Sequence, residues 1–297
     1  MNIYLFGSTN ATGESFRHQA TQSLSPWSVH TYSRYSSLPS FDFSNPFTFL
    51  PSGISGSPTL WICFGPIWLF ASFIEQLNRV HPERLVGIRG VIACSSSSVI
   101  TKRFSANRFD RELVHRLSSA EDSLLSLCRT LHVPCHILQP TLIYGKSGPY
   151  GDRNLSKILK LLRWLPFIPI PSDTGLRQPI HASQLAAVAL HIAELIRESS
   201  CDQCLPERIP LGGDTSLTYT MMIRSLLQAQ QSRDSAFRCR LLPIPNRLFF
   251  SLASPLLLFS PKAFEAVLRT GVNLSGFTPT HQLLSSEAQP FPVFPLA

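Results

Sequence analysis

The stretch that decides the fold is Asn2-Ile3-Tyr4-Leu5-Phe6-Gly7-Ser8-Thr9-Asn10-Ala11-Thr12-Gly13, near the start of the chain. Its first five residues form a short β-like run, and the small residues after them lead into a helical stretch from about Glu14. A sharp turn between strand and helix needs small side chains, and it directs backbone N–H groups and a helix N-terminus at an anion. The pattern therefore predicts a phosphate-binding turn after the first strand.

The spacing within this turn approaches a G-x-x-G-x-x-G pattern. Gly7 and Gly13 occupy its two ends, and Asn10 stands where the middle glycine would be. Asn is one of the few residues that tolerate a left-handed backbone, so we expect Asn10 to adopt one. Thr9 and Thr12 are further candidates for contact with a bound dinucleotide. An ordinary tight turn is the alternative interpretation.

Short β-like runs alternate with helical stretches through the first half of the chain, which is typical of an α/β fold with a doubly wound parallel sheet. The expected strands are Asn2 to Phe6, Ser28 to Tyr32, Leu60 to Phe64, Gly90 to Cys94 and Cys135 to Leu138. The clearest helix runs from about Arg111 to His132, where apolar residues recur at spacings of three and four. We expect this helix to pack on the sheet.

The character of the chain changes beyond Tyr144, with basic helical turns, a Pro-rich run at 166–171 and later apolar helices. We expect a Rossmann-type nucleotide-binding domain over residues 1–145. A smaller substrate-binding region would occupy 146–297, of which about 178–215 returns to the core. Together they would form a cleft over the carboxyl ends of the strands, where open α/β sheets bind ligands.

Composition narrows the range of partners. The 297 residues carry a net charge of +8, but the Lys and Arg residues are scattered and form no basic and aromatic stripe, so we expect anionic small molecules and no nucleic acid. The chain has seven Cys, an odd number, and its N-terminus does not resemble an export signal. Both observations argue against a disulfide framework, and we expect the protein to be cytoplasmic. Cys201 and Cys204 lack the other two ligands of a structural zinc site, so we expect no metal.

Two apolar stretches, Leu60 to Phe73 and Leu248 to Phe259, bear on membrane association. Both are interrupted by Pro and shorter than the roughly 20 residues that cross a bilayer. We expect both to be buried elements and the protein to have no firm membrane association. Peripheral membrane contact through the second stretch is the alternative.

The end of the second strand indicates which dinucleotide is bound. Arg34 stands where an acidic residue would hold the ribose 2′-hydroxyl of NAD, and an Arg there can pair with the 2′-phosphate of NADP. We therefore expect NADP, with NAD as the alternative, unless Arg34 is only a solvated loop cation. Asp42, between Phe41 and Phe43 near the end of a strand, is expected to accept a hydrogen bond from the adenine, or else to cap the next turn.

Several motifs, taken in order, resemble the extended or atypical short-chain dehydrogenase/reductase superfamily, and within it the NAD-dependent epimerase/dehydratase group that acts on nucleotide sugars. The resemblance covers most of the chain. It rests on Gly7 to Gly13, Tyr32-Ser33-Arg34, Asp42, Cys94-Ser95-Ser96-Ser97-Ser98-Val99, Glu121, Leu138 to Gly145, and Gly175 to His181. It implies NAD(P)-dependent hydride transfer on a nucleotide sugar or a related polyol.

One departure from the family affects the predicted catalytic site. Its members use a Ser or Thr together with a Tyr and a Lys spaced by four on the following helix, and the resemblance puts the Ser at Ser96. The Tyr and Lys positions fall on Leu113 and Leu117, and no Tyr occurs between Tyr35 and Tyr144. A leucine has no titratable proton, so the usual proton relay cannot operate at these positions.

Replacement groups for this relay can be named from the sequence. Ser96 would hydrogen-bond a substrate carbonyl, Lys102 would supply charge, and Tyr144 would serve as the acid, although a packed aromatic with a bonded hydroxyl is the alternative for Tyr144. His115 is an imidazole, a common general acid, but it lies off the apolar stripe of its helix. The hypotheses are thus an oxidoreductase or epimerase with a non-standard site, a catalytically inactive NADP(H)-binding regulator, or a peripheral membrane protein.

Substrate contacts are expected from the second half. Arg177 and His181, with the basic stretch of Arg153, Lys157 and Lys160, would face the diphosphate of a nucleotide sugar, because guanidinium groups bind phosphate oxygens bidentately. An ordinary surface helix explains the basic stretch equally well. Asp152 and Asn154 would bind sugar hydroxyls or cap the following helix. A homodimer is left open.

Overall fold

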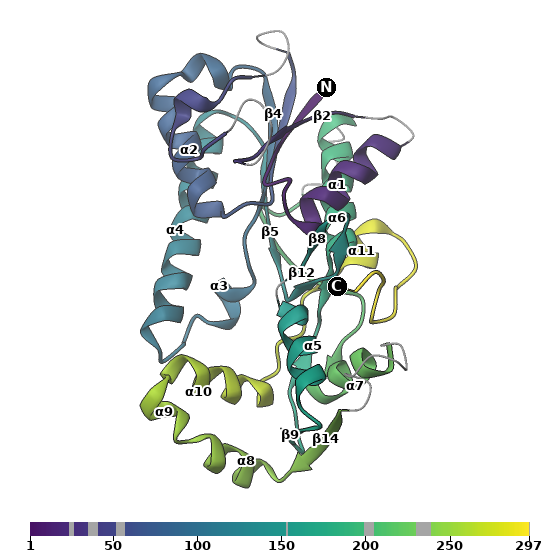
Figure 1. The fold of residues 1–297 in the computed structure, drawn as a ribbon. Coiled ribbons are helices and arrows are strands. Elements are labelled where there is room, and N and C mark those ends of the chain that lie inside the picture. Colours follow the sequence, from purple (N-terminus) through teal and green to yellow (C-terminus); the bar gives the residue numbers. More distant parts are fainter. Residues whose placement is uncertain are drawn as a thin grey trace.

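A sheet of seven parallel strands organises the molecule (Figure 1). The computed structural model describes residues 1–23, 27–34, 41–51, 57–152, 154–198, 205–229 and 239–296. The strand order is β15-β12-β5-β4-β3-β1-β2. The strands are β1 (Asn2–Phe6), β2 (Ser28–Tyr32), β3 (Thr59–Cys63), β4 (Ile88–Cys94), β5 (Cys135–Pro140), β12 (Arg208–Gly212) and β15 (Thr278–Pro279). The α/β doubly wound fold expected from the sequence is confirmed.

Helices cover both faces of this sheet, because alternate residues of each strand point to opposite sides. Ile3 and Leu5 of β1 pack toward α1 (Ala11–Gln22) and α6 (Ala182–Glu198). Tyr4 and Phe6 pack toward the other face, which α2 (Ile67–Val80) and α4 (Arg108–Thr130) cover. Figure 1 shows the two layers on either side of the sheet.

The predicted elements agree closely with these bounds. β1 and β2 begin and end where expected, β3 and β4 begin one and two residues before the predicted starts, and the long helix is displaced by two or three residues. β3 and one face of α2 are buried, as predicted for Leu60 to Phe73. α1 begins at Ala11 and not near Glu14, because Asn10 caps it.

The second half adds a smaller layer beyond the carboxyl ends of the strands. Its apolar core is formed by α5 (Asn154–Trp164), α7 (Tyr219–Ala229) and the parallel pair β9 (Phe167–Pro171) and β14 (Arg240–Ile244). An arm of three short helices follows: α8 (Asn246–Ala253), α9 (Leu256–Phe259) and α10 (Pro261–Leu268). α6 covers the main sheet and β12 extends it.

The remaining elements are short. They are η1 (Pro46–Thr48), η2 (Pro82–Leu85), α3 (Ser98–Thr101), β6 (Ile143–Tyr144), β7 (Lys146–Ser147), β8 (Tyr150–Gly151), β10 (Leu176–Arg177), β11 (Ile180–His181), β13 (Leu217–Thr218), η4 (Arg269–Gly271) and α11 (Thr280–Leu284).

One burial prediction is wrong. Leu248 to Phe259 is not a buried element, since no residue of α8 or α9 is buried. Apolar composition predicts burial only where another element covers the apolar face, and none of the described residues covers it here. Within the described part of the chain, no helix combines the length and the apolar character needed to cross a membrane.

Phe6 is central to the core between the sheet and α2. It is fully buried, and its ring centroid lies 5.4 Å from that of Trp61 and 5.2 Å from that of Phe70. We expect Phe6→Ala to lower the free energy of unfolding by about 3–5 kcal/mol, because it removes these contacts and leaves a cavity. Phe104→Ala, at a ring that is 93% exposed, should change it by less than about 0.5 kcal/mol. Urea unfolding followed by circular dichroism measures both; equal effects would contradict the assignment of the core.

Candidate functional site

A cavity of about 640 Å³ opens at the carboxyl ends of β1 to β4. It is lined by Gly7, Thr9, Asn10, Tyr32, Ser33, Arg34, Phe41, Phe43, Phe64, Gly65, Pro66, Ile67, Trp68, Leu69, Cys94, Ser95, Ser96, Leu113, Leu117 and Ile143. A larger cavity, of about 890 Å³, lies at the amino ends of the strands near Met1, Ile88 and Pro134. Open α/β sheets bind ligands at the carboxyl ends, so the first cavity is the candidate site.

The turn after β1 requires glycine at both ends. Gly7 has a φ of 77°, and a Cβ on it would lie 2.5 Å from the backbone nitrogen of Gly65. A Cβ on Gly13 would lie 2.5 Å from the carbonyl oxygen of Gly7. The glycines thus allow a left-handed turn, close contact with the chain after β3, and close approach of α1 to β1.

Asn10 acts as a brace and a helix cap. Its backbone is extended, with φ −142°, so the predicted left-handed conformation is wrong. Its side-chain amide donates to the carbonyl oxygens of Gly7 at 2.8 Å and Phe64 at 3.0 Å, and its side-chain oxygen accepts from the N–H of Gly13 at 2.9 Å. One side chain therefore joins the turn, the end of β3 and the start of α1.

The first amides of α1 are left for a ligand. None of the described residues accepts a hydrogen bond from the backbone N–H of Ala11 or Thr12. Such amides, together with the helix dipole, favour an anion at the helix N-terminus. Of the predicted contacts, Gly7, Thr9 and Asn10 line the cavity, whereas Thr12 and Gly13 are buried behind the turn.

Arg34 and Asp42 have different environments. Arg34 is exposed and lines the cavity beyond the end of β2. Asp42 lies in a turn and not near the end of a strand, and its carboxylate accepts a hydrogen bond from the N–H of Ser44 at 3.0 Å, which lowers the pKa of Asp42. Asp42 does not line the cavity, so its geometry matches the capping alternative.

Ser96 lies at the opposite end of the cavity from Arg34, beyond the end of β4. Its hydroxyl oxygen accepts from the N–H of Ser98 at 3.1 Å and donates to the Ser98 hydroxyl at 3.0 Å. Leu113 and Leu117 of α4 line the same cavity. The structure therefore brings together Ser96 and the two positions at which the resemblance expects the Tyr and the Lys. Burial raises the pKa of the Cys94 thiol, also in the lining, to about 12.

The described lining residues thus offer little for proton transfer. They include no carboxylate, no imidazole and no ammonium group. A thiol with a pKa near 12 is a poor acid at neutral pH. The hydroxyl groups of the lining include that of Tyr32, which donates to the carbonyl oxygen of Leu50 at 3.2 Å, and that of Ser96. Proton exchange with a bound substrate would depend on such hydroxyls or on water.

Glu121 holds the end of β4 in place, a role that was not predicted from the sequence. Its buried carboxylate accepts from the Ser95 hydroxyl at 2.5 Å, the Gln139 amide at 2.8 Å and the Arg208 guanidinium at 3.0 Å. Ser95 directly precedes Ser96, so Glu121 fixes the backbone that presents Ser96. The sequence contains a clue to this role, because Glu121 lies within the apolar stripe of its helix. A carboxylate in such a position is buried only where other groups pair with it.

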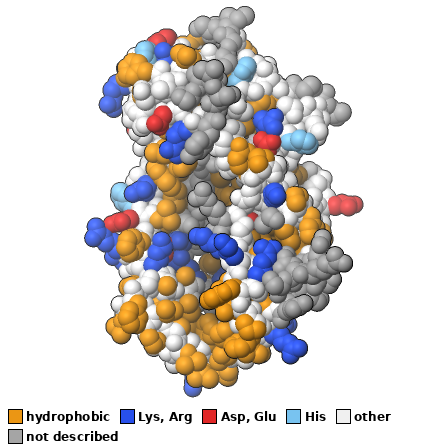
Figure 2. All heavy atoms as spheres, in the orientation of Figure 1, with side chains coloured by type: hydrophobic (Ala, Val, Ile, Leu, Met, Phe, Trp, Pro, Cys, Tyr) orange, Lys and Arg blue, Asp and Glu red, His pale blue; other side chains and the backbone are white. Residues whose placement is uncertain are grey.

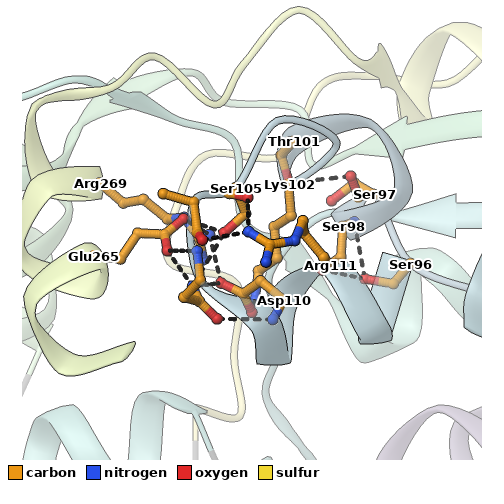
Figure 3. A network of polar contacts seen from close by, with 12 residues as sticks. Ser96, Ser97, Ser98, Thr101, Lys102, Ser105, Asp110, Arg111, Glu265 and Arg269 are labelled. Atoms are coloured by element: carbon orange, nitrogen blue, oxygen red, sulfur yellow. Dashed lines mark hydrogen bonds and ion pairs between the residues drawn. The ribbon is translucent and has the colours of Figure 1, made fainter. Parts of the chain in front are cut away.

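Lys102 does not line the cavity. Its ammonium group lies 2.8 Å from a carboxylate oxygen of Asp110, and the other oxygen lies 2.6 Å from the Arg269 guanidinium (Figure 3). Glu265 of α10 completes the network through Ser105, Asn107 and Arg269. Lys102 thus helps to tie the loop before α4 to the arm, away from the site where it was expected to act.

Tyr144, Arg177 and His181 also make internal contacts and do not line the cavity. The Tyr144 hydroxyl accepts from the N–H of Val293 at 2.9 Å, and burial raises the pKa of Tyr144 to about 12, as the packed-aromatic alternative requires. His181 hydrogen-bonds with the carbonyl oxygen of Pro295 at 3.0 Å, and burial lowers the pKa of His181.

Arg177 is held by carbonyl groups. Its guanidinium donates to the carbonyl oxygens of Leu176 at 2.7 Å and Val272 at 2.6 Å. The guanidinium N–H groups that would bind a diphosphate are therefore already hydrogen-bonded to the backbone.

The other candidates of the second half do not meet at the cavity either. Lys157 and Lys160 are exposed on α5, and His115 is exposed on α4. Asp152 accepts from the N–H of Leu155 at 2.6 Å, as the capping alternative predicts. Arg153, the side chain of Asn154, and the pair Cys201 and Cys204 lie outside the described residues.

Comparison with known proteins identifies the class of fold. No protein-family model and no curated protein matches the chain. Solved structures that resemble it share a Rossmann-type architecture. The triphenylmethane reductase of Citrobacter sp., complexed with NADP(H), is 13% identical with a TM-score of 0.62, over 98% of this chain and 97% of the reductase.

Two further structures are similar. UDP-galactose 4-epimerase is 13% identical with a TM-score of 0.56, over 91% of this chain and 97% of the epimerase. The dTDP-glucose 4,6-dehydratase of Bacillus anthracis, in complex with NAD, is 15% identical with a TM-score of 0.55, over 83% of this chain and 86% of the dehydratase. At such identities the likeness establishes the Rossmann-type fold.

The network around Asp110 should make stability depend on pH. Burial alone would raise the pKa of Asp110, but hydrogen bonds from Lys102, Asn107 and Arg269 outweigh it and hold the pKa well below its usual range. The ionised carboxylate therefore stabilises the fold above the unfolded-state pKa of about 4, and this stabilisation is lost as the pH falls below that value. We expect Asp110→Asn to cost about 3 kcal/mol at neutral pH and to weaken the acid dependence.

The matched control is Glu112→Gln on the same helix. Glu112 pairs with Arg108 at 2.6 Å, but both side chains are mainly exposed. An exposed pair contributes at most about 1 kcal/mol. Unfolding free energies measured from pH 2 to 7 test this; an unchanged acid dependence in Asp110→Asn would contradict the assignment.

Proposed function

We propose that the cavity binds a pyridine dinucleotide, NADP in preference to NAD. One observation carries the proposal: the glycine turn, which leads into the unpaired amides at the start of α1, and Arg34 line the same cavity. The amides suit a pyrophosphate and the guanidinium suits a 2′-phosphate. The complexes of similar fold with NADP(H) and with NAD support this proposal.

The described residues fit such a ligand. A Cβ on Gly65 would lie 3.3 Å from the Phe43 ring, and Phe41 and Phe43 provide apolar walls near Arg34. Among the described lining residues there is no carboxylate that would repel a 2′-phosphate. A volume of about 640 Å³ lies within the range of roughly 300–1,000 Å³ typical of cofactor sites.

We further propose that the site serves hydride transfer on a nucleotide sugar or a related polyol. A bound nicotinamide would supply or accept the hydride. Ser96 would donate a hydrogen bond to the substrate carbonyl and orient it, while Leu113 and Leu117 would exclude water from that end. The epimerase and the dehydratase of similar fold act on substrates of this class and support the proposal.

The second candidate function is a regulatory protein that binds NADP(H) without turning it over. The observation that favours it is the pair of leucines at the positions where the resemblance expects Tyr and Lys. Binding needs only the turn and Arg34, whereas turnover also needs a proton source.

The contact with the 2′-phosphate is tested by Arg34→Glu. We expect the dissociation constant of NADPH to rise about tenfold or more, because a charge-assisted hydrogen bond is lost and a like charge is introduced. That of NADH should change by less than about threefold. Arg79→Glu, at the exposed far end of α2, makes the same change in net charge and should alter neither. Calorimetric titration measures the four constants; equal losses for both nucleotides in Arg34→Glu would overturn the assignment.

Turnover distinguishes the two candidate functions. Under the first, the protein oxidises NADPH in the presence of a panel of keto-sugar nucleotides, and Ser96→Ala lowers kcat by about 100-fold, since a donor to the reacting oxygen is removed. Ser118→Ala, on α4 and away from the cavity lining, should leave kcat unchanged. NADPH binding without oxidation by any substrate of the panel would favour the regulatory protein.

A further inference from the structure

The arm of α8, α9 and α10 presents an apolar surface. None of the residues in these three helices is buried. Leu258 and Phe259 are each 85% exposed, and Leu248, Leu252 and Leu257 are more than half exposed. Large apolar side chains gathered on one surface indicate an interaction site, whereas scattered ones are ordinary.

The apolar surface continues onto the neighbouring strands and α5. β14 leads directly into α8 and pairs with β9, and exposed apolar side chains occur on both strands and at the end of α5. They are Leu161, Trp164, Phe167 and Leu242. Figure 2 shows hydrophobic side chains gathered over the end of the molecule that carries the arm in Figure 1, bordered by Lys and Arg. We call this surface the arm face.

The charges around the arm face are predominantly positive. Residues 240–268 contain Arg240, Arg247 and Lys262, and their single acid is Glu265. Glu265 accepts hydrogen bonds from Ser105 and Asn107 and pairs with Arg269 at 2.8 Å, so its charge is neutralised within the network. Residues 154–173 add Lys157, Lys160 and Arg163 and one acid, Asp173, whose backbone exchanges hydrogen bonds with the Asn246 side chain at the start of α8.

We propose that the arm face docks reversibly on the surface of an anionic lipid bilayer. Short amphipathic helices with leucine and phenylalanine on one side and cations at the border lie in the membrane interface, with their apolar side chains inserted below the headgroups. Anionic headgroups then neutralise the bordering cations. The docking is peripheral, and it does not depend on the proposed binding of NADP(H).

Charge favours a bilayer over a second copy of the chain. A symmetric dimer through the arm face would bring the same surface of both copies together, so the cations of one border would meet those of the other. Like charges across an interface disfavour association. An anionic surface has the opposite sign.

The network of Figure 3 orients the arm for such docking. Arg269, directly after α10, pairs with Asp110 of α4 at 2.6 Å. The polar side of the arm is therefore held against the loop before α4, and its apolar side faces outward. Little ordering of the arm is needed on binding, which lowers the cost of association.

Vesicle flotation of the full chain tests the proposal. We expect the protein to float with vesicles of mixed phosphatidylcholine and phosphatidylglycerol, to float poorly with phosphatidylcholine alone, and to be released by salt. The double substitution Leu258→Ser and Phe259→Ser should weaken binding by roughly tenfold or more, because two inserted side chains are lost. Val86→Ser, at a side chain that is 63% exposed away from the arm, should bind as the unaltered chain does.

Charge variants provide a second readout. Arg247→Gln and Lys262→Gln should each weaken binding to anionic vesicles by about fivefold, with no effect on the little binding to phosphatidylcholine. Circular dichroism and NADPH titration of every variant separate a docking defect from misfolding or from failure of the cofactor proposal.

Three results would overturn the proposal. The unaltered chain could fail to float with anionic vesicles, or the double variant could float as well as the unaltered chain. Sedimentation equilibrium could instead show a dimer that the double substitution converts to monomer, in which case a second copy covers the arm face.

Discussion

The site depends on the contact between the turn after β1 and the chain that leaves β3. A Cβ on Gly7 would lie 2.5 Å from the backbone nitrogen of Gly65, so the turn has no room for a side chain at that point. Asn10 fixes the arrangement by donating to the carbonyl oxygens of Gly7 and Phe64. If these contacts were lost, Gly7, Thr9 and Asn10 would no longer be held in place along the cavity.

The elements of the fold could be predicted because their signals are local. Apolar residues alternate or cluster over the five positions of β1 and of β2, and they recur at helical spacing in α4. The bounds of these three elements were therefore predicted to within three residues. The glycine turn and Arg34 follow those strands directly, and the structure brings both to one cavity. Asn10 was located correctly but for the wrong reason, since capping and a left-handed backbone both favour Asn.

The residues that could not be placed have partners, or partners of their partners, far away in the sequence. Lys102 pairs with Asp110, whose second partner is Arg269, while Tyr144 bonds to Val293 and His181 to Pro295. The sequence does not distinguish a titratable side chain that binds a ligand from one that hydrogen-bonds to a backbone carbonyl. Likewise, the apolar run from Leu248 to Phe259 does not show whether another element covers it, and here the described residues leave it exposed.

α4 connects the two surfaces of interest. Asp110 in its first turn anchors the arm through Arg269, and Leu113 and Leu117, one and two turns further along, form part of the cavity wall. A helix moves as a stiff rod over so short a distance. A displacement of the arm that keeps this ion pair would therefore act on α4, the helix that carries part of the cavity wall.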